Sequence, residues 1–197
     1  MFRPLCVLCF VALLGACAAQ QFEADVTRFH VAGLSDYEGK RVRVEPARDD
    51  IDGVVFARYA AMLGERLAAL GFVPAGKDEP DWLARLDYSV TATETAPESG
   101  ARIGIGGGHF GRHVGVSGAV GFPIGGHAPE AVYNRRISLA LIEAGSGRRL
   151  WEGRAVSTGR TADLDAVMPL LIKALLEGFP GESGRTVKVR LPVEERE

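Results

Sequence analysis

Cysteine is scarce in this sequence and is confined to one end of it. Of 197 residues three are cysteine, and Cys6, Cys9 and Cys17 all fall within the first 17 positions. The first two lie inside an apolar run, so cleavage before Cys17 would leave a chain with one cysteine. An isolated chain of that kind cannot build a disulfide framework, which excludes the class of small disulfide-stapled secreted domains.

A long apolar run and an excess of charge of one sign are also missing. The apolar run at residues 5–14 is ten residues long, whereas a membrane-spanning helix needs about 20. The formal net charge of −2 gives no electrostatic reason to expect nucleic acid as a partner. A hydrophobic fraction of 47% and a charged fraction of 24% are typical of one globular domain of usual size.

The first 17 residues have the three-part layout of an export signal. Arg3 supplies a positive charge, residues 5–14 form the apolar core, and Gly15-Ala16 are small residues before the cut. Leu14-Gly15-Ala16-Cys17 resembles a bacterial lipobox. This resemblance implies a diacylglycerol on the Cys17 thiol, cleavage before it, and a further acyl chain such as palmitate on the new amine. The alternative is an ordinary secretory signal with an incidental cysteine.

We therefore interpret residues 1–16 as a lipoprotein signal peptide and residues 17–21 as a lipidated tether. Three acyl chains would make the attachment effectively permanent, since each buried methylene contributes ~0.8 kcal/mol. Ala18-Ala19 lack the aspartate that is associated with retention in the inner membrane, so we expect an outer-membrane protein that faces the periplasm. Five extended residues reach at most ~18 Å, so the domain should lie close to the membrane surface.

The periodicity of apolar residues predicts one α+β domain over residues 22–191, followed by a frayed tail at 192–197. Strict alternation is clearest at residues 82–93 and indicates a strand with one buried face. The expected fold is a mainly antiparallel sheet of about five to six strands with two helices packed on one face. Strands are expected at 22–31, 41–45, 82–93, 132–143, 150–157 and 186–191, and helices at 52–70 and 163–178.

Several single residues carry local predictions. Asp49 or Asp50 is expected to cap the first helix, and Gly71 is expected to end it in a left-handed conformation. Trp82 and Trp151 fall on alternating strands and are expected in the core rather than in a ligand site.

The excess of glycine is concentrated in one segment. Of 25 glycines, 11 fall within the 27 positions from Gly100 to Gly126. Each glycine costs a helix ~1 kcal/mol relative to alanine, and glycine-rich strands specify their register weakly. We expect residues 100–129 to form a mobile loop or a hairpin inserted between two strands, with contact to the membrane as an alternative.

Tests for catalytic and ligand-binding motifs give little. Gly106–Gly111 formally matches the dinucleotide fingerprint, but no helix is expected after it, so we expect no nucleotide partner and no cofactor. His109, His113 and His127 are weak metal candidates, because no Asp or Glu lies between Gly100 and Pro129 to complete a site. Hydrolase patterns fail as well, so we do not expect an enzyme.

The order of weak motifs along the chain resembles the bacterial lipoproteins of the domain of unknown function DUF4136. The resemblance covers residues 22–180, and no single motif in it is catalytic. It implies an envelope lipoprotein with an α+β domain and carries over no functional residue. The matching stretches are Asp25-Val26-Thr27-Arg28-Phe29, Arg41-Val42-Arg43-Val44, Leu70-Gly71-Phe72, Pro80-Asp81-Trp82-Leu83, Ile137-Ser138-Leu139-Ala140-Leu141-Ile142-Glu143-Ala144, Leu150-Trp151-Glu152-Gly153-Arg154-Ala155 and Gly178-Phe179-Pro180.

Together these observations favour a non-catalytic binding or structural module of the cell envelope. The membrane partner is expected through Cys17, and a further partner would be an envelope protein, a glycan or a lipid. The alternative is an envelope enzyme, or a binder of a metal or small molecule, with its site in the glycine-rich segment.

Overall fold

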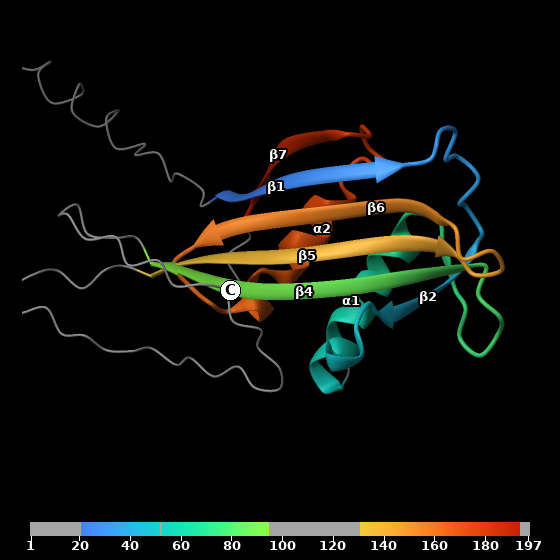
Figure 1. The fold of residues 1–197 in the computed structure, drawn as a ribbon, viewed down its shortest axis with the longest axis horizontal. Helices are drawn as coiled ribbons and strands as arrows, with labels where there is room; N and C mark the ends of the chain where they lie inside the picture. Colours follow the sequence, from blue (N-terminus) through green and yellow to red (C-terminus); the bar gives the residue numbers. More distant parts are fainter. Residues whose placement is uncertain (1–20, 52, 95–130, 194–197) are drawn as a thin grey trace, which may run out of the picture.

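The fold is known from a computed structural model, which describes residues 21–51, 53–94 and 131–193 (Figure 1). The lipobox, the tether before residue 21, the glycine-rich segment and the last four residues lie outside the described residues. The elements follow one another as β1 (Gln21–His30), β2 (Arg41–Pro46), η1 (Asp49–Ile51), α1 (Val54–Ala69), β3 (Val73–Pro74), β4 (Trp82–Glu94), β5 (Ala131–Glu143), β6 (Arg149–Gly159), α2 (Leu164–Leu176) and β7 (Arg185–Pro192).

The strands form one mixed sheet in the order β3-β2-β4-β5-β6-β1-β7. Four of the six neighbouring pairs are antiparallel, and β2 pairs in parallel with both β3 and β4. An α+β architecture is therefore confirmed, but the expected five to six strands are too few. The described sheet has seven strands because β3, with two residues, is too short to show any alternation in the sequence.

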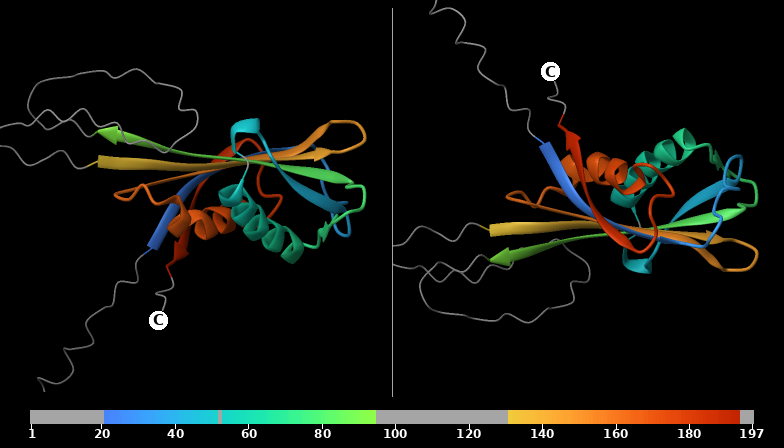
Figure 2. Two further views of the ribbon diagram at one scale, coloured as in Figure 1. Left: turned by 90° about the horizontal axis from the view of Figure 1, so that it is seen from below. Right: turned by 90° about the horizontal axis from the view of Figure 1, so that it is seen from above.

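Both helices lie on the same side of this sheet (Figure 2). On α1 the residues Tyr59, Leu63 and Leu67 are buried at helical spacing. Gly71 ends this helix with a φ of +98°, as predicted. The predicted cap is wrong: Gly53 occupies the N-cap position without a side-chain hydrogen bond, and Asp49 and Asp50 belong to η1.

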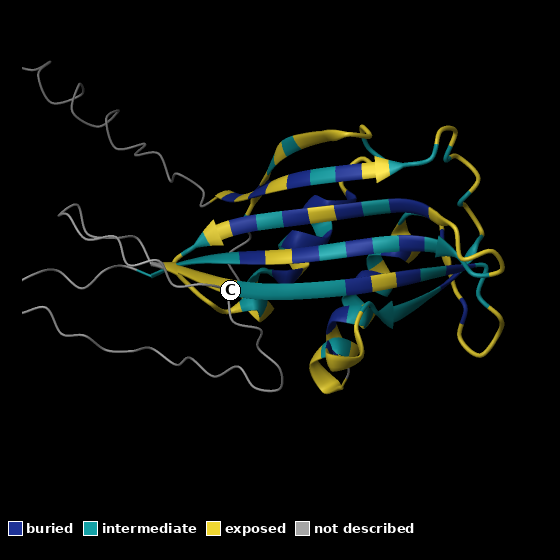
Figure 3. Cartoon of the chain, in the orientation of Figure 1, coloured by how far each residue is buried: buried dark blue, intermediate teal, exposed yellow. Residues whose placement is uncertain are grey.

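The core fills the space between the helices and the sheet. Alternate residues on the central strands are buried, which gives the banded pattern of Figure 3. Trp82 and Trp151 are 5% and 1% exposed, as the sequence predicts. Phe179 follows α2 and packs its ring 5.4 Å from that of Trp151 and 6.0 Å from that of Phe72.

Helix α2 approaches β6 at a position without a side chain. A Cβ atom built on Gly153 would lie 2.9 Å from Cδ1 of Leu175 and would also overlap the indole ring of Trp151. Carbon atoms in proteins do not come this close, so neighbouring atoms would have to move apart. A densely packed interior has no space for that movement. The absence of a side chain at residue 153 therefore fixes how closely α2 lies on the sheet.

The carboxyl end of α2 is held by a buried cation. Arg28 is 5% exposed, and its Nε and Nη2 atoms donate hydrogen bonds of 2.9 Å to the carbonyl oxygens of Leu175 and Ala174. The last carbonyls of a helix have no partners within the helix and carry its negative dipole end. One guanidinium thus donates to two carbonyls of the last turn, of which that of Ala174 also accepts from the Glu177 N–H at 3.4 Å.

A second polar contact joins the two helices near the start of α2. The buried Tyr59 hydroxyl of α1 donates a short hydrogen bond to the Asp165 carboxylate of α2, which also pairs with Arg58. The hydrogen bond from Tyr59, followed by the one from Arg58, holds the pKa of Asp165 below its ordinary value. Arg58 and Asp165 are about half exposed, so their ion pair contributes little.

We predict that Gly153→Ala destabilises the fold, because the added methyl group pushes α2 away from the sheet. The free energy of unfolding should fall by about 1–3 kcal/mol, as for other overpacked sites. Chemical denaturation followed by circular dichroism measures it. Gly145→Ala is the matched control, because no atom lies within 4 Å of a Cβ built there. Equal stability of the two variants would contradict this account of the α2 contact.

We predict that Tyr59→Phe lowers the free energy of unfolding by about 1–2 kcal/mol at neutral pH, since a hydrogen bond to a charged acceptor is lost. Because the pKa of Asp165 is depressed in the folded state, its contribution is present above the ordinary aspartate pKa of ~3.9 and is lost as the pH falls further. The difference between the native chain and Tyr59→Phe should therefore shrink below about pH 4.

Denaturant titrations at several pH values test this prediction. Tyr88→Phe is the control, since Tyr88 packs its ring 5.0 Å from that of Tyr59 and its hydroxyl has no hydrogen bond within the described part of the chain. Its effect should stay within about 0.5 kcal/mol. A loss at Tyr59→Phe that is the same at all pH values would refute the role of the Asp165 carboxylate.

Candidate binding surface

The site residues predicted from the sequence lie outside the described residues. Cys17, His109, His113 and His127 all belong to segments that the structure does not describe. The remaining histidine, His30, is structural, since its ring nitrogens lie 3.0 Å from the carbonyl oxygens of Val31 and Gly181. Residues 21–51, 53–94 and 131–193 contain no group of three or more His, Cys, Asp or Glu side chains able to hold a metal ion.

Neither described helix could cross a membrane, because neither is long and apolar enough. What the described fold offers instead is the sheet face opposite the helices. Of the described elements, η1 lies on this side at one margin, and the strands β1, β5 and β6 are left without a covering layer (Figure 2). The side chains that point to this side are polar on most strands.

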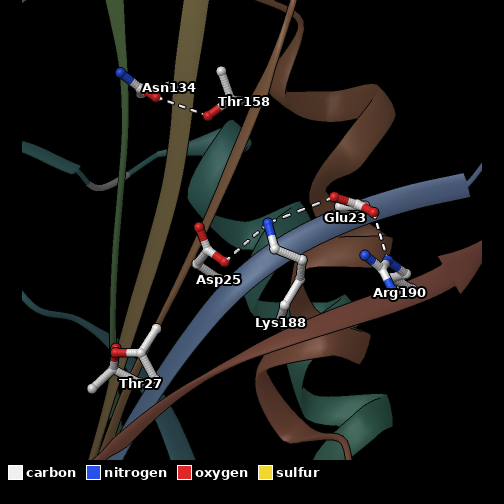
Figure 4. A network of polar contacts seen from close by, with 8 residues as sticks. Glu23, Asp25, Thr27, Asn134, Thr158, Lys188 and Arg190 are labelled. Carbon is white, nitrogen blue, oxygen red and sulfur yellow. Dashed lines mark hydrogen bonds and ion pairs between the residues drawn. The ribbon is translucent and has the colours of Figure 1, made fainter.

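One part of this face is a ladder of charges between β1 and the edge strand β7 (Figure 4). Arg190 donates a 2.6 Å hydrogen bond to Glu23, and Lys188 Nζ lies 3.6 Å from Glu23 and 3.4 Å from Asp25. The hydrogen bond from Arg190 lowers the pKa of Glu23. Exposed pairs of this kind stabilise a fold only weakly. The opposite charges neutralise one another here, because the carboxylates of Glu23 and Asp25 both have a cationic partner.

A second ladder crosses the sheet near the ends of β4 and β6. The Asn134 amide donates to Thr93 Oγ1 at 3.0 Å. The Thr158 hydroxyl donates to Asn134 Oδ1 at 3.1 Å (Figure 4). Here too the polar groups are mutually satisfied. The middle of the face differs from both ladders, because one of its charged side chains has no partner among the described residues.

The middle is a shallow depression of about 430 Å³. Its charged groups are mostly paired: Asp87 accepts a 3.0 Å hydrogen bond from Arg48 Nε, and Glu152 accepts one of 2.5 Å from Arg149. Arg154, in contrast, is exposed and has no ion pair or hydrogen bond to any described residue. Its lining includes Phe29, Ser138, Ala140 and Arg154. We call this part of the face the central depression.

Three strands bring these groups together. Arg154 on β6 lies directly opposite Ser138 on β5 and Thr27 on β1, so a hydroxyl stands on each side of it. Phe29, two residues beyond Thr27, is 48% exposed. The depression thus combines a free guanidinium, hydroxyl groups and an exposed ring. This combination can bind an anionic group with an apolar neighbour, and it contains no cysteine or histidine among its lining residues.

Comparison with solved structures finds distant similarities, among them the following two proteins. A PDZ domain protein from Parabacteroides distasonis superposes with a TM-score of 0.49 and 16% identity, covering 87% of this chain and 39% of that chain. PelC from Paraburkholderia phytofirmans, a dodecamer solved in two space groups, superposes with a TM-score of 0.41 and 14% identity, covering 78% of this chain and 94% of that chain. The chain therefore spans well under half of the first of these proteins. Similarities of this size carry no information about function.

No curated protein sequence matches the chain. The family comparison, in contrast, is clear and confirms the resemblance seen in the sequence. The model of a domain of unknown function, DUF4136, matches residues 34–181. This stretch is more than half of the chain and contains every described element except β1 and β7. The chain therefore belongs to the DUF4136 family.

Proposed function

We propose that this chain is an outer-membrane-anchored lipoprotein whose domain faces the periplasm and serves as a non-catalytic binding module of the cell envelope. The anchor is supported by Leu14-Gly15-Ala16-Cys17 and by the apolar run before it. The start of the fold agrees with this proposal, since β1 begins at Gln21, four residues after Cys17. Four extended residues reach about 14 Å, which keeps the domain next to the bilayer.

The binding role is supported by one observation above all: the Arg154 guanidinium in the central depression has no partner among the described residues. A guanidinium pairs best with a carboxylate, which accepts two parallel hydrogen bonds. The depression is shallow and lies on an open sheet face, so it suits the surface of another protein more than a small molecule, which binds in a cleft that encloses it. The partner in this proposal is an envelope protein that presents a carboxylate to Arg154 and an apolar group to Phe29.

The lipid anchor is tested by Cys17→Ser in cells labelled with an acyl-chain probe. We expect the native chain to carry the label and to sediment with outer membranes. The variant should lose the label, since serine has no thiol to receive the diacylglycerol. Cys9→Ser is the control, because it changes a cysteine of the apolar leader only. Label that persists on Cys17→Ser would disprove the proposed lipidation.

The binding surface is tested by photo-crosslinking in vivo from Ala140→benzoylphenylalanine, which places the probe in the central depression. We expect a crosslinked protein whose yield falls at least ~10-fold in the Arg154→Glu background, because like charges at an interface oppose association strongly. Lys77→Glu, at an exposed cation in the turn after β3, is the control and should leave the yield unchanged. A crosslink that is indifferent to Arg154→Glu would count against the central depression.

A further inference from the structure

Two arginines are buried on the helix-facing side of the sheet. Arg28 on β1 and Arg135 on β5 are each 5% exposed. The two differ in what surrounds their charge. Arg28 donates to two helix carbonyls, and the charge of Glu177 offsets part of the effect of burial on its pKa. For Arg135 burial alone lowers the pKa, and no described residue supplies a counter-charge.

Among the described residues the guanidinium of Arg135 also has no hydrogen-bond partner. Its Nε atom is fully buried and has no acceptor, and its Nη atoms donate to no described residue. Directly opposite on β6 lies Ser157, which is 2% exposed. Its hydroxyl is likewise buried and has no partner in the part of the chain that the structure describes. Leaving the Nε–H group and the hydroxyl buried in this state is costly, because no described group accepts a hydrogen bond from them. A bound ion or ligand is one of the ways in which such groups are completed.

The guanidinium points toward one end of the sheet. A Cβ atom built on Gly159, the last residue of β6, would lie 3.0 Å from Cζ and 3.2 Å from Nη1 of Arg135. The side chain therefore runs from the level of Ser157 to the level of Gly159, where the strand ends. The glycine leaves the room that the guanidinium occupies.

The helix end at this place cannot satisfy an arginine. Helix α2 begins at Leu164, five residues after Gly159, whereas its last carbonyls lie at the other end and bind Arg28. The first turn of a helix presents N–H donors and a positive dipole end. Of these donors, the N–H of Ala166 is capped by Asp163. The carboxylates at this end are used elsewhere: Asp163 caps Ala166, and Asp165 pairs with Tyr59 and Arg58. No described carboxylate pairs with Arg135, so the group that would complete it is an acceptor with negative charge.

The same end of the sheet is the end where the described chain begins. Strand β1 starts here at Gln21, beside the end of β6 (Figure 1). Arg135 lies about three residues along the strands and two strands across from Gln21, which corresponds to ~10 Å in each direction. If Cys17 is lipidated, as in the proposed function on which this step rests, the donors face the headgroup region of the membrane.

We propose that Arg135 and Ser157 form a phosphate-binding site that takes the phosphate group of a membrane phospholipid. A phosphate oxyanion accepts two parallel hydrogen bonds from the guanidinium and a third from the hydroxyl. A free phosphate ion presents the same chemistry, so the source is separated by experiment.

Binding is measured with the full chain purified in a neutral detergent at constant ionic strength. The two probes are inorganic phosphate and dihexanoyl phosphatidic acid, and isothermal titration calorimetry gives both affinities. Binding of the lipid supports the proposal with a headgroup as the source. Binding of inorganic phosphate alone supports the site but assigns it to the free ion. Binding of neither probe overturns it.

The matched variants are Arg135→Met and Arg136→Met. Arg136 is the next residue of β5 and is exposed on the opposite face of the sheet. We expect Arg135→Met to weaken phosphate binding at least ~10-fold, since a charge-assisted pair of hydrogen bonds is lost. Ser157→Ala should weaken it by a smaller factor, and Arg136→Met should leave it within ~2-fold. Equal binding by Arg135→Met and the native chain would refute the site.

A melting experiment separates a ligand-binding role from a structural one. An arginine that is buried without partners destabilises the unliganded fold, so Arg135→Met should raise the melting temperature by ~2 °C or more without phosphate. Arg28→Met should lower it, because the carbonyls of Ala174 and Leu175 each lose a charged donor. A lower melting temperature for Arg135→Met would overturn the proposal.

The test is independent of lipidation. Cys17→Ser in the same detergent should bind inorganic phosphate as the native chain does, because Arg135 and Ser157 are unchanged. Loss of acylation together with retained phosphate binding would disprove only the anchor and not the site. Retained acylation together with absent phosphate binding would disprove only the site.

Discussion

Helix α2 lies close to the sheet because residue 153 has no side chain. The Leu175 methyl group and the Trp151 ring occupy the space that a Cβ atom would take, and this contact sets the height of the helix above β6 and β1. The positions of its two ends follow from it. At the carboxyl end the last carbonyls come within 2.9 Å of the guanidinium of Arg28, and Phe179 turns back onto Trp151. Near the amino end, Asp165 comes within reach of Tyr59 on α1.

The polarity of this helix explains why two arginines on one sheet face have different surroundings. A helix offers free carbonyl oxygens at one end and free N–H groups at the other. Arg28 lies under the carbonyl end and is satisfied by it. Arg135 lies toward the other end, where the helix backbone offers free N–H groups and no free carbonyl oxygen. That Arg135 and Ser157 have no partner among the described residues thus follows from the direction in which α2 crosses the sheet, and the proposed anion would complete them.

Much of the fold could be predicted from the sequence because alternation and helical spacing are strong on the long elements. The strand at Trp82–Glu94 and both helices were predicted within a few residues of their observed bounds. Alternation says which face a residue lies on, but it does not say which strands are neighbours. The parallel pairing of β2 with β4 and the two-residue β3 were therefore missed, and so was the close approach at Gly153.

The candidate sites were missed for related reasons. The central depression combines Phe29, Ser138 and Arg154 from three strands. Which of their residues lie side by side depends on the pairing and register of the strands, which the sequence pattern does not give. For Arg135 a signal was present: it shares its strand phase with Ile137, Leu139 and Leu141, all buried. A charge in the apolar phase of a strand predicts either a buried partner or a ligand. Arg28 shows the same pattern but has protein partners, the two carbonyl oxygens of α2. It shares its strand phase with the buried residues Phe22, Ala24 and Val26.

The two proposed surfaces constrain how the domain stands on a membrane. Phosphate at Arg135 and an anchor before Gln21 both place the same end of the sheet at the headgroups, so the strands would rise from the bilayer. The face with Arg154 would then stand upright, with its depression directed sideways into the periplasm. Lipid and protein would reach separate sides of one sheet, because alternate residues point to opposite faces. The adjacent residues Arg135 and Arg136 of β5 show this separation, because Arg135 lies on the buried, helix-facing side of the sheet and Arg136 is exposed on the opposite side.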